Sequence, residues 1–275
     1  MSEITRTAVI GSPIEHSLSP TIHNHWFTKE QMKNHTYDKI EVELNNFSET
    51  IDSLNKQGCF GLNVTVPLKE VAYEKSDTLS ENASQTKAVN TLWFKDGKIF
   101  GDNTDPVGFT KSLPDKVIDK KINSKNCLLL GAGGSSRAVL WSLTQLNANI
   151  AIYNRTEEKA ENLLKTVGVN GKILKKEELD DYVSTSSFIV NTTSLGLQEG
   201  EVNDLINFEN VRSDTYVYDL IYNPPLSSFL DQAKNKKLKT QNGLRMLVEQ
   251  AAASFKIWHS ISPNIDDELM EKLGA

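Results

Sequence analysis

One segment near the middle of the chain indicates its fold most clearly: Cys127-Leu128-Leu129-Leu130-Gly131-Ala132-Gly133-Gly134-Ser135-Ser136-Arg137. An apolar run meets a glycine-rich turn, and a helix-like segment follows it. A buried strand, a glycine turn and a helix N-terminus in this order form the pyrophosphate site of many α/β proteins. The glycines let the backbone approach the phosphates, and the unpaired N–H groups at the helix start favour negative charge. We therefore expect a dinucleotide on Gly131, Ala132, Gly133, Gly134 and Ser135.

The strand after this turn indicates which dinucleotide binds. An NAD site carries Asp or Glu about 20 residues beyond the turn, where the carboxylate holds the ribose 2′-hydroxyl. Here the predicted strand 149–153 ends in Asn154-Arg155-Thr156. A guanidinium suits a 2′-phosphate, so NADP is the expected cofactor. Glu157 and Glu158 follow, and their negative charge argues against a bound 2′-phosphate. Thr156 can also be explained as the cap of a helix with acids in its first turn. The positive charges of Arg155 and Lys159 are given more weight than these two arguments.

Composition limits the class of protein. The chain has 275 residues, of which 38% are hydrophobic and 24% charged, as expected for a soluble protein of two domains. Its net charge of −6 argues against nucleic acid or an anionic membrane as a partner. No segment approaches the roughly 20 apolar residues of a membrane helix, and the N-terminus lacks the apolar region of a signal peptide.

The cysteines and histidines carry little functional signal. Cys59 and Cys127 are isolated from each other, which fits a reducing compartment and predicts a cytoplasmic protein. The five histidines form no recognisable ligand set, so we expect no metal. A small-molecule substrate is the expected partner, and the sequence leaves monomer and homodimer both open.

Strand-like and helix-like segments alternate along the chain, which predicts the α/β class. In the first half, strands are expected at 7–11, 36–42 and 61–66, and helices at 20–32, 47–56 and from 69 onward. A hairpin is expected with strands at 89–94 and 98–101 and a turn at Asp96-Gly97. In the second half, five strands are expected at 128–130, 149–153, 172–174, 188–191 and 216–219. A polar stretch, 114–126, is expected to be a connector. The final helix, 244–258, has an apolar stripe of period 3.6, with Met246 and Gln250 on a different face.

A strand with one polar face leads to a lysine in the first half. In residues 61–69, GLNVTVPLK, alternation puts Asn63 and Thr65 on one face and apolar residues on the other. Lys69 lies at the start of the next helix, where a cation opposes the helix dipole and does not stabilise the helix. A solvated surface lysine is the ordinary alternative. The polar face that ends at Lys69 favours a functional role.

A carboxylate in the next polar stretch is the candidate partner of this lysine. Residues 101–105, GDNTD, otherwise suit a turn or a helix cap. If Asp105 meets Lys69, the carboxylate orients the ammonium, which can then exchange a proton with a substrate oxygen. Reduction of a ketone by hydride needs such a donor. Asn90, in Ala88-Val89-Asn90-Thr91, adds a hydrogen-bonding group in this half.

Two serines near the N-terminus have two open interpretations. In the first interpretation, Ser19 is only the N-cap of a helix and Pro20 is its first residue. Ser17 stands two residues earlier, and two hydroxyls beside helix N–H groups form a cradle for a small carboxylate.

Polar residues also follow the strands of the second half. The carboxyl ends of strands in open α/β sheets are where ligands bind. Thr192 and Ser194 follow the strand that ends at Asn191, and Leu220 and Tyr222 follow the one that ends at Asp219. A turn with a packed tyrosine is the ordinary alternative for the last group.

Taken together, these residues resemble the shikimate dehydrogenase family over nearly the whole chain. The resemblance is carried by eight segments in the family's order: 16–20, 61–69, 88–91, 101–105, 131–137, 154–156, 219–224, and 242–244 with 250–252. The family reduces 3-dehydroshikimate to shikimate with NADPH, reversibly. The resemblance implies an N-terminal α/β substrate domain, residues 1–106 completed by 243–275, and a Rossmann-type NADP-binding domain, residues 107–242.

The resemblance also implies roles for individual residues. Lys69 would be the acid/base residue and Asp105 its partner, while Ser17 and Ser19 would hold the substrate carboxylate. The residues implied to bind the ring hydroxyls or the carboxylate are Asn63, Thr65, Asn90, Tyr222 and Gln250. Those implied to bind the cofactor are Gly131 to Ser135, Asn154, Arg155, Thr156, Lys159, Thr192, Ser194, Leu220, Gly243 and Met246.

Three positions depart from the family pattern. Pro106 follows Asp105 where glycine is usual, Arg245 stands where a small residue is usual, and Lys87 precedes Ala88 where glycine is common. None removes a matched chemical group. Two other functions stay open: a quinate/shikimate dehydrogenase that uses NAD, and a non-catalytic NADP-binding sensor on the same fold. Intact Lys69 and Asp105 argue against the sensor.

Overall fold

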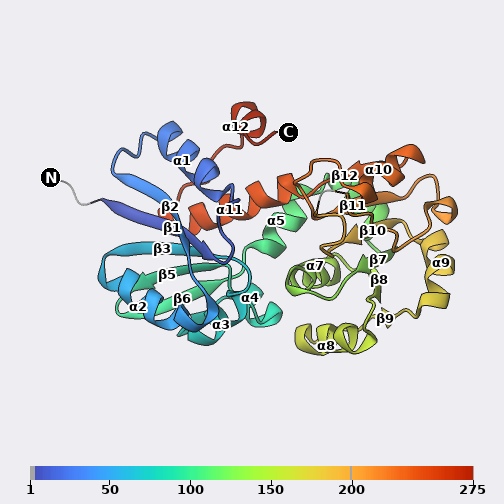
Figure 1. The fold of residues 1–275 in the computed structure, drawn as a ribbon, viewed down its shortest axis with the longest axis horizontal. Coiled ribbons are helices and arrows are strands. Elements are labelled where there is room, and N and C mark those ends of the chain that lie inside the picture. Colours follow the sequence, from blue (N-terminus) through green and yellow to red (C-terminus); the bar gives the residue numbers. More distant parts are fainter. Residues whose placement is uncertain (1–3, 199, 275) are drawn as a thin grey trace. The chain divides into compact units, whose positions relative to one another are not determined.

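The computed structural model describes residues 4–198 and 200–274, which form two compact units (Figure 1). One unit comprises the chain up to Gly108 together with Val248 onward, and the other is Phe109–Leu247. Both boundaries fall within helices, α5 (Asp105–Ser112) and α11 (Leu244–His259). Among the described residues, no helix has the length and apolar character that a membrane span requires.

The first unit contains a six-stranded mixed sheet in the order β2-β1-β3-β5-β6-β4. Its strands are β1 (Thr5–Gly11), β2 (His35–Glu41), β3 (Cys59–Val64), β4 (Thr78–Leu79), β5 (Thr91–Lys95) and β6 (Lys98–Asp102). The pairings of β1 with β2 and β3, and of β4 with β6, are parallel, whereas β5 is antiparallel to β3 and β6. The β5–β6 hairpin turns at Asp96-Gly97, which both have positive φ, as expected.

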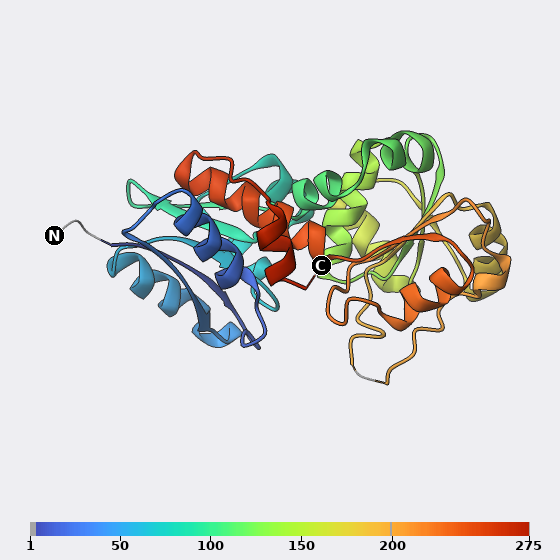
Figure 2. The ribbon, with the colours of Figure 1, turned by 90° about the horizontal axis from the view of Figure 1, so that it is seen from above.

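Helices cover both faces of this sheet. On one face, α2 (Phe47–Lys56) and α3 (Lys69–Lys75) pack over an apolar core that includes Ile51, Leu62 and Val64. On the other face, Figure 2 shows α1 (Ser19–Lys29), in blue, beside α11 and α12 (Asp267–Lys272), in red. Two short helices, η1 (Leu44–Asn46) and α4 (Glu81–Thr86), complete the unit.

The two faces of β3 differ as its alternation predicts. Leu62 and Val64 belong to the apolar core, whereas Gly61 and Asn63 face α11. A Cβ on Gly61 would lie 2.5 Å from the indole nitrogen of Trp258, so only glycine allows this helix to approach. The polar face of β3 is therefore covered by a helix from the far end of the chain.

Aromatic rings and histidines fill the space between β2, α1 and α11. The His23 ring stacks on Tyr37, with ring centroids 4.1 Å apart, and His259 packs against Phe255 at 4.6 Å. Both ring nitrogens of His23 and Nε2 of His259 are buried without a hydrogen-bond partner among the described residues. Burial lowers the pKa of His23 well below its ordinary value and lowers the pKa of His259 to about 4.

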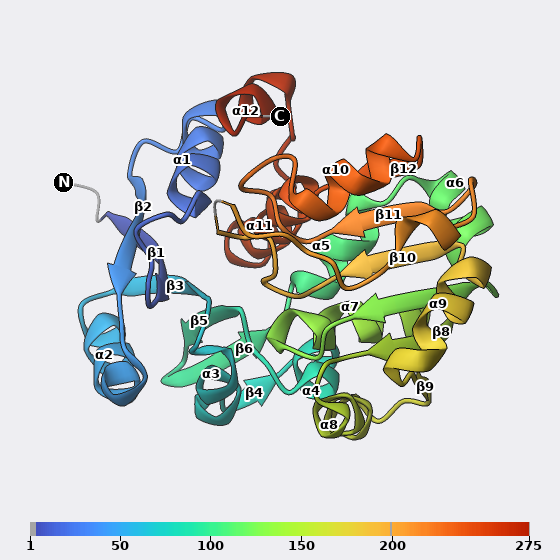
Figure 3. The same ribbon diagram turned by 45° about the vertical axis from the view of Figure 1, so that its right-hand side comes forward.

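The second unit contains a six-stranded, fully parallel sheet in the order β12-β11-β10-β7-β8-β9. Its strands are β7 (Asn126–Leu130), β8 (Asn149–Tyr153), β9 (Lys172–Ile173), β10 (Phe188–Asn191), β11 (Tyr216–Asp219) and β12 (Lys239–Gln241). In Figure 3, β12, β11 and β10 follow one another, and β8 and β9 lie beyond them, with β7 between β10 and β8. If β7 is counted as strand 1 and the sheet is read from β9 to β12, the order is 3-2-1-4-5-6. This is the strand order of dinucleotide-binding doubly wound sheets. The predicted Rossmann-type fold is confirmed.

Helices cover this sheet on both faces, each with its own apolar core. One core contains residues of α7 (Gly134–Gln145) and α8 (Glu157–Val167), packed on Leu129 and Ile152. The other contains residues of α9 (Lys176–Thr185) and α10 (Ser228–Asn235), packed on Leu128 and Leu130. The alternation of Leu128, Leu129 and Leu130 between the two cores explains why this strand is apolar on both sides. A 3-10 turn, η3 (Phe208–Asn210), lies beside α9.

Two local expectations are wrong. Leu18, not Ser19, is the N-cap of α1, which begins at Ser19 without a side-chain cap. The Ser17 hydroxyl instead accepts a hydrogen bond from the Ser19 N–H at 3.3 Å. The predicted connector 114–126 contains helical turns, α6 (Asp115–Val117) and η2 (Ile118–Ile122), because Val117 and Ile122 are buried in the core of the second unit.

We predict that acid weakens the first unit through its buried histidines. Because the folded-state pKa of His259, about 4, lies below its ordinary value of 6.5, the unfolded chain binds more protons between these values. The free energy of unfolding should therefore fall as pH falls from 6.5 to 4, measured by urea denaturation and tryptophan fluorescence. The variant His259→Phe should flatten this fall, whereas exposed His16→Gln should not. An unchanged slope in His259→Phe would contradict the assignment.

Candidate active site

The first sheet brings three polar segments to one edge. Asn63 lies near the end of β3 and is paired with Thr91 at the start of β5, which is in turn paired with Asp102 at the end of β6. Because β5 is antiparallel to its neighbours, its first residue meets their last residues. Asn90, just before β5, and Asp105, just after β6, therefore share this edge with Asn63. Sequence spacing alone does not give this proximity.

Lys69 and Asp105 form an ion pair at this edge. Lys69 Nζ lies 2.5 Å from Asp105 Oδ2, and the two side chains are 20% and 11% exposed. Lys69 begins α3 and Asp105 begins α5, so the pair joins two helix N-termini. The ammonium is held by a charge-assisted hydrogen bond and still has solvent access. It can exchange a proton with a bound molecule.

Asn90 holds the second oxygen of the same carboxylate. Its Nδ2 donates to Asp105 Oδ1 at 2.8 Å and to Gln250 Oε1 at 3.3 Å. Its Oδ1 accepts from the Thr104 N–H at 2.8 Å and from the Thr91 hydroxyl at 2.9 Å. Since a backbone N–H can only donate, the amide oxygen must face Thr104 and the NH₂ group must face Asp105. The orientation of the carboxylate is thus fixed from both oxygens.

Asn63 lies beside this group and is almost fully buried. Its Nδ2 donates to the Asn90 carbonyl at 3.1 Å, the Thr91 hydroxyl at 3.2 Å and the Ser254 hydroxyl at 2.9 Å. Ser254, on α11, also bonds to Thr91 at 2.7 Å. Thr65, half-buried, directly follows β3 and stands two residues after Asn63. The buried hydroxyls of Thr91 and Ser254 therefore hydrogen-bond to the asparagine side chains and hold them in place.

The glycine turn of the second unit, residues 131–134, is tightly packed at Gly131 and has free space beside Gly133 and Gly134. Gly131 has φ of +103°, and a Cβ there would lie 2.8 Å from the Thr192 hydroxyl, so glycine is required by the fold. At Gly133 and Gly134, by contrast, an added Cβ would meet no atom within 4 Å. Neither residue has a positive φ. The fold does not need glycine at these two positions, but a ligand that approaches the backbone does.

This turn fits a dinucleotide phosphate. Gly133 is the N-cap of α7, so the first N–H groups of the helix point toward the open space at Gly133 and Gly134. Ser135 is half-buried in the first turn of the helix. The Ser136 hydroxyl accepts from the Gly133 N–H at 2.9 Å and contacts the Thr192 hydroxyl at 2.7 Å, which fixes the shape of the turn.

The loop after β8 and the start of α8 present two exposed cations. Arg155 and Lys159 are exposed, and within the part of the chain that the structure describes neither forms an ion pair. Asn154 Nδ2 donates to the Thr156 carbonyl at 2.8 Å, which shapes the turn before α8. Thr156 is the N-cap of that helix by position, without a side-chain hydrogen bond. Both cations are available to an anionic group.

A buried carboxylate supports the ends of β10 and β11. Asp219 accepts hydrogen bonds from Asn191 Nδ2 at 2.9 Å, the Ile221 N–H at 3.1 Å and the Ser227 hydroxyl at 2.5 Å. Burial raises the pKa of Asp219, and these donors oppose part of that rise. The network fixes the loops that carry Ser194, which is exposed, and Tyr222, which is partly buried.

Gly243 and Met246 pack inside the second unit. A Cβ on Gly243 would lie 2.0 Å from the Leu220 carbonyl oxygen, so this glycine permits a close approach of two backbones. Met246 is 7% exposed and belongs to the core that contains Phe109 and Tyr218. Their contact with a cofactor, and that of Leu220, stays a prediction.

Comparison with known proteins identifies the family. Residues 9–92 match the family described as "Shikimate dehydrogenase substrate binding domain", 113–220 match "Shikimate / quinate 5-dehydrogenase", and 243–271 match "Shikimate 5'-dehydrogenase C-terminal domain". A relative from Pelagibacter ubique, named shikimate dehydrogenase (NADP(+)), is 40% identical over 96% of this chain and 97% of its own. The chain belongs to the shikimate dehydrogenase family.

Solved structures of shikimate dehydrogenases share this fold. One in complex with NADP⁺ has a TM-score of 0.89 and 35% identity, covering 98% of this chain and 94% of its own. The Thermus thermophilus enzyme, in complex with NADP(H) and shikimate, has a TM-score of 0.85 and 31% identity, covering 98% of both chains. The resemblance seen in the sequence is thus confirmed.

Two departures from the shikimate dehydrogenase pattern have a local explanation. Lys87 is the C-cap of α4 and has φ of 50° in the left-handed region, where glycine is the residue of lowest strain. Its ammonium lies over the Tyr73 ring, 5.4 Å from the centroid. Pro106 is the second residue of α5, a first-turn position that tolerates proline. Neither disturbs the Lys69–Asp105 pair.

Several residues that support the site are of types too common to be recognised from the sequence. Thr91, Thr104 and Ser254 hold the two asparagines, yet a lone Thr or Ser in a strand or helix is unremarkable in sequence. Ser254 stands one helical turn after Gln250, to whose carbonyl it donates at 3.1 Å. That spacing is the one signal that could have linked it to the site.

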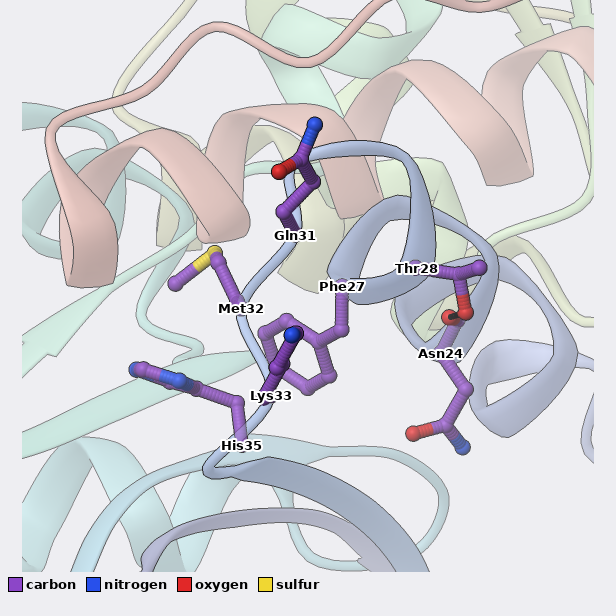
Figure 4. A pocket seen from close by; sticks show the side chains of 7 residues that line it. All are labelled: Asn24, Phe27, Thr28, Gln31, Met32, Lys33 and His35. Carbon is purple, nitrogen blue, oxygen red and sulfur yellow. Dashed lines mark hydrogen bonds between the residues drawn. The ribbon is translucent and has the colours of Figure 1, made fainter. Parts of the chain in front are cut away.

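A pocket elsewhere in the first unit contains none of the predicted site residues. Its volume is about 420 Å³, and Figure 4 shows the Phe27 ring between Asn24 and Thr28 of α1 on one side and Met32 and His35 on the other. It lies at the end of α1 opposite to Ser19. Among the described residues, no group of three His, Cys, Asp or Glu side chains is arranged to hold a metal ion.

We predict that two glycines of the turn differ in what they do. Gly133→Ala should leave the melting temperature unchanged but raise the dissociation constant for the dinucleotide, measured with NADP by calorimetry, about tenfold or more, since a methyl group enters the open space. Gly131→Ala should instead destabilise the fold by about 1–3 kcal/mol, because of its positive φ and the Thr192 contact. Equal NADP affinity in Gly133→Ala and wild type would remove the turn from the cofactor site.

Proposed function

We propose that the protein is an NADP-dependent shikimate dehydrogenase, which reversibly reduces 3-dehydroshikimate to shikimate. The observation that carries this proposal is the Lys69–Asp105 pair, with 2.5 Å between Nζ and Oδ2, in a chain of this family. Relatives named shikimate dehydrogenase (NADP(+)) and a structure in complex with NADP(H) and shikimate support it.

Lys69 is the proton donor in this proposal. When bound, NADPH supplies a hydride to the carbonyl carbon of 3-dehydroshikimate. Negative charge then builds on the carbonyl oxygen, and Lys69 Nζ gives that oxygen a proton. Asp105 keeps the ammonium in position through Oδ2, while Asn90 holds Oδ1. In the oxidative direction the neutral amine of Lys69 takes the proton of the shikimate hydroxyl.

Polar residues around this pair bind the substrate in the proposal. Ser17 and Ser19, next to the N-terminus of α1, hold the substrate carboxylate with their hydroxyls. Gln250 adds an amide group beside Asn90, to which it is hydrogen-bonded. The residues proposed to contact the ring hydroxyls or the carboxylate are Asn63, Thr65, Asn90, Tyr222 and Gln250.

The second unit binds NADP in the proposal. The open space at Gly133 and Gly134 receives the pyrophosphate, and Arg155 with Lys159 receives the 2′-phosphate. The remaining proposed contacts are Gly131, Ala132, Ser135, Asn154, Thr156, Thr192, Ser194, Leu220, Gly243 and Met246. Residues 1–106 with 243–275 then form the substrate domain, and 107–242 the cofactor domain.

Cellular location is part of the same proposal. Cys59 and Cys127 are free and buried thiols, which fits a reducing cytoplasm. Burial raises the pKa of Cys59 to about 11 and the pKa of Cys127 to about 12, so neither thiol is reactive at neutral pH.

We predict that Lys69→Ala abolishes turnover while shikimate binding stays detectable. The variant loses the proton donor but keeps Ser17, Ser19 and Asn63. Oxidation of shikimate with NADP, and reduction of 3-dehydroshikimate with NADPH, are followed by absorbance at the NADPH band, and binding by calorimetry. Lys75→Ala, at the last residue of the same helix and paired with Asp52, is the matched control and should keep full activity. Unchanged turnover in Lys69→Ala would remove Lys69 from the mechanism.

We predict that Arg155 sets the choice between NADP and NAD. Arg155→Ala should raise the KM for NADP about tenfold, the effect of losing roughly 1.4 kcal/mol, and leave the KM for NAD within twofold. Lys165→Ala, an exposed lysine in the last turn of α8, controls for net charge. A wild-type preference for NADH over NADPH at equal concentration would favour the NAD-dependent quinate/shikimate dehydrogenase instead. Binding of NADP without any turnover would favour the sensor.

A further inference from the structure

A buried tyrosine contacts the asparagine that the proposed function assigns to substrate. Tyr37, on β2, is 2% exposed, and its hydroxyl donates to Asn63 Oδ1 at 2.6 Å. No residue role in the family resemblance includes Tyr37. In sequence it stands inside a strand, where a tyrosine is an ordinary packed residue.

The direction of this hydrogen bond follows from the rest of the network. The Asn63 NH₂ group faces the Asn90 carbonyl at 3.1 Å, and a carbonyl can only accept. The amide oxygen must therefore face Tyr37, so the phenol must donate. An amide oxygen has two lone pairs, and Tyr37 uses one of them. The other can accept the proton of a substrate hydroxyl.

Tyr37 is itself held rigidly. Asn24, on α1, accepts from the Tyr37 N–H through Oδ1 at 3.1 Å and donates to the Tyr37 carbonyl through Nδ2 at 2.9 Å. The backbone is also paired with Thr7 of β1. The His23 ring lies on the phenol ring at 4.1 Å, with 6° between the ring planes. The hydrogen bonds to Asn24, the strand pairing with Thr7 and the stacking on His23 together fix the position of the Tyr37 hydroxyl.

The surroundings also keep the phenol protonated. Burial raises the pKa of Tyr37 well above its ordinary value, and the Ser19 hydroxyl opposes part of this rise. The Tyr37 hydroxyl is therefore protonated, and can donate, at neutral pH. Ser19 is the residue proposed to hold the substrate carboxylate, so Tyr37 adjoins two of the proposed substrate contacts.

We propose that Tyr37 is a positioning residue for substrate binding: its hydroxyl fixes the Asn63 amide in the orientation that accepts a ring hydroxyl. This inference rests on the proposed function for the identity of the substrate. It concerns a residue that acts through Asn63 and does not touch the reacting atoms, so its loss should change substrate affinity more than the chemical step.

Tyr37→Phe tests the proposal because it removes the hydroxyl and keeps the ring on His23. The KM for shikimate should rise roughly fivefold, the order expected for one net hydrogen bond, while kcat and the KM for NADP stay within twofold. Tyr218→Phe is the matched control. Tyr218 is likewise fully buried and bonded through its hydroxyl, to Ser112 at 2.8 Å, but belongs to the second unit. It should leave the KM for shikimate unchanged.

A double-mutant cycle separates positioning from general loss of packing. In the Asn63→Ala background, Tyr37→Phe should have no further effect on the KM for shikimate, since the group that it positions is gone. Additive effects would overturn the proposal. So would a lowered melting temperature with an unchanged KM, which would mean that the hydroxyl serves stability alone.

Failure of the proposed function would be recognised separately. If the wild type does not oxidise shikimate with NADP, the activity is wrong, and the positioning is then judged without substrate. The side-chain amide protons of Asn63, assigned in NMR spectra by their loss in Asn63→Ala, should shift in Tyr37→Phe and not in Tyr218→Phe. Unchanged Asn63 amide signals in Tyr37→Phe would overturn the positioning itself.

Discussion

The candidate site in the first unit depends on the Asp105 carboxylate, which two donors share. Lys69 Nζ holds one oxygen at 2.5 Å and Asn90 Nδ2 holds the other at 2.8 Å. The second donor needs the reversed strand β5: the first residues of β5 meet the ends of β3 and β6, and Asn90 precedes it directly. In a fully parallel sheet the start of β5 would lie at the opposite edge, and Asp105 would lose its second donor.

Beneath this carboxylate, backbone groups with fixed roles set the orientation of the buried amides. The Thr104 N–H and the Asn90 carbonyl cannot change their roles as donor and acceptor, so they fix the Asn90 and Asn63 amides in turn. Ser254 reaches the network from α11, near the far end of the chain. Such a network is stable only when every member is satisfied, which explains why it is so fully connected.

The expected cofactor residues that share one short segment follow most directly from the sequence. Gly131, Gly133 and Arg155 stand in a strand–turn–helix–strand unit whose spacing reflects its geometry, and the Rossmann-type sheet is confirmed. The Ser19 cap was wrong because a hydroxyl and a proline define a helix start only within a residue or two. The sequence leaves the contact between Lys69 and Asp105 as a condition, since no local pattern brings these two residues together.

The α/β class, the doubly wound sheet, the glycine turn and the membership of the shikimate dehydrogenase family all follow from the sequence alone. These features depend on hydrophobic alternation and on backbone freedom at single residues, which are local properties. Which side chains share hydrogen bonds depends on the tertiary fold. Tyr37, Asn63, Asn90 and Ser254 lie on four separate segments, and a serine or a buried tyrosine carries no sign of its partner. Their proximity comes from strand order and from the return of α11 to the first sheet, which no local pattern encodes.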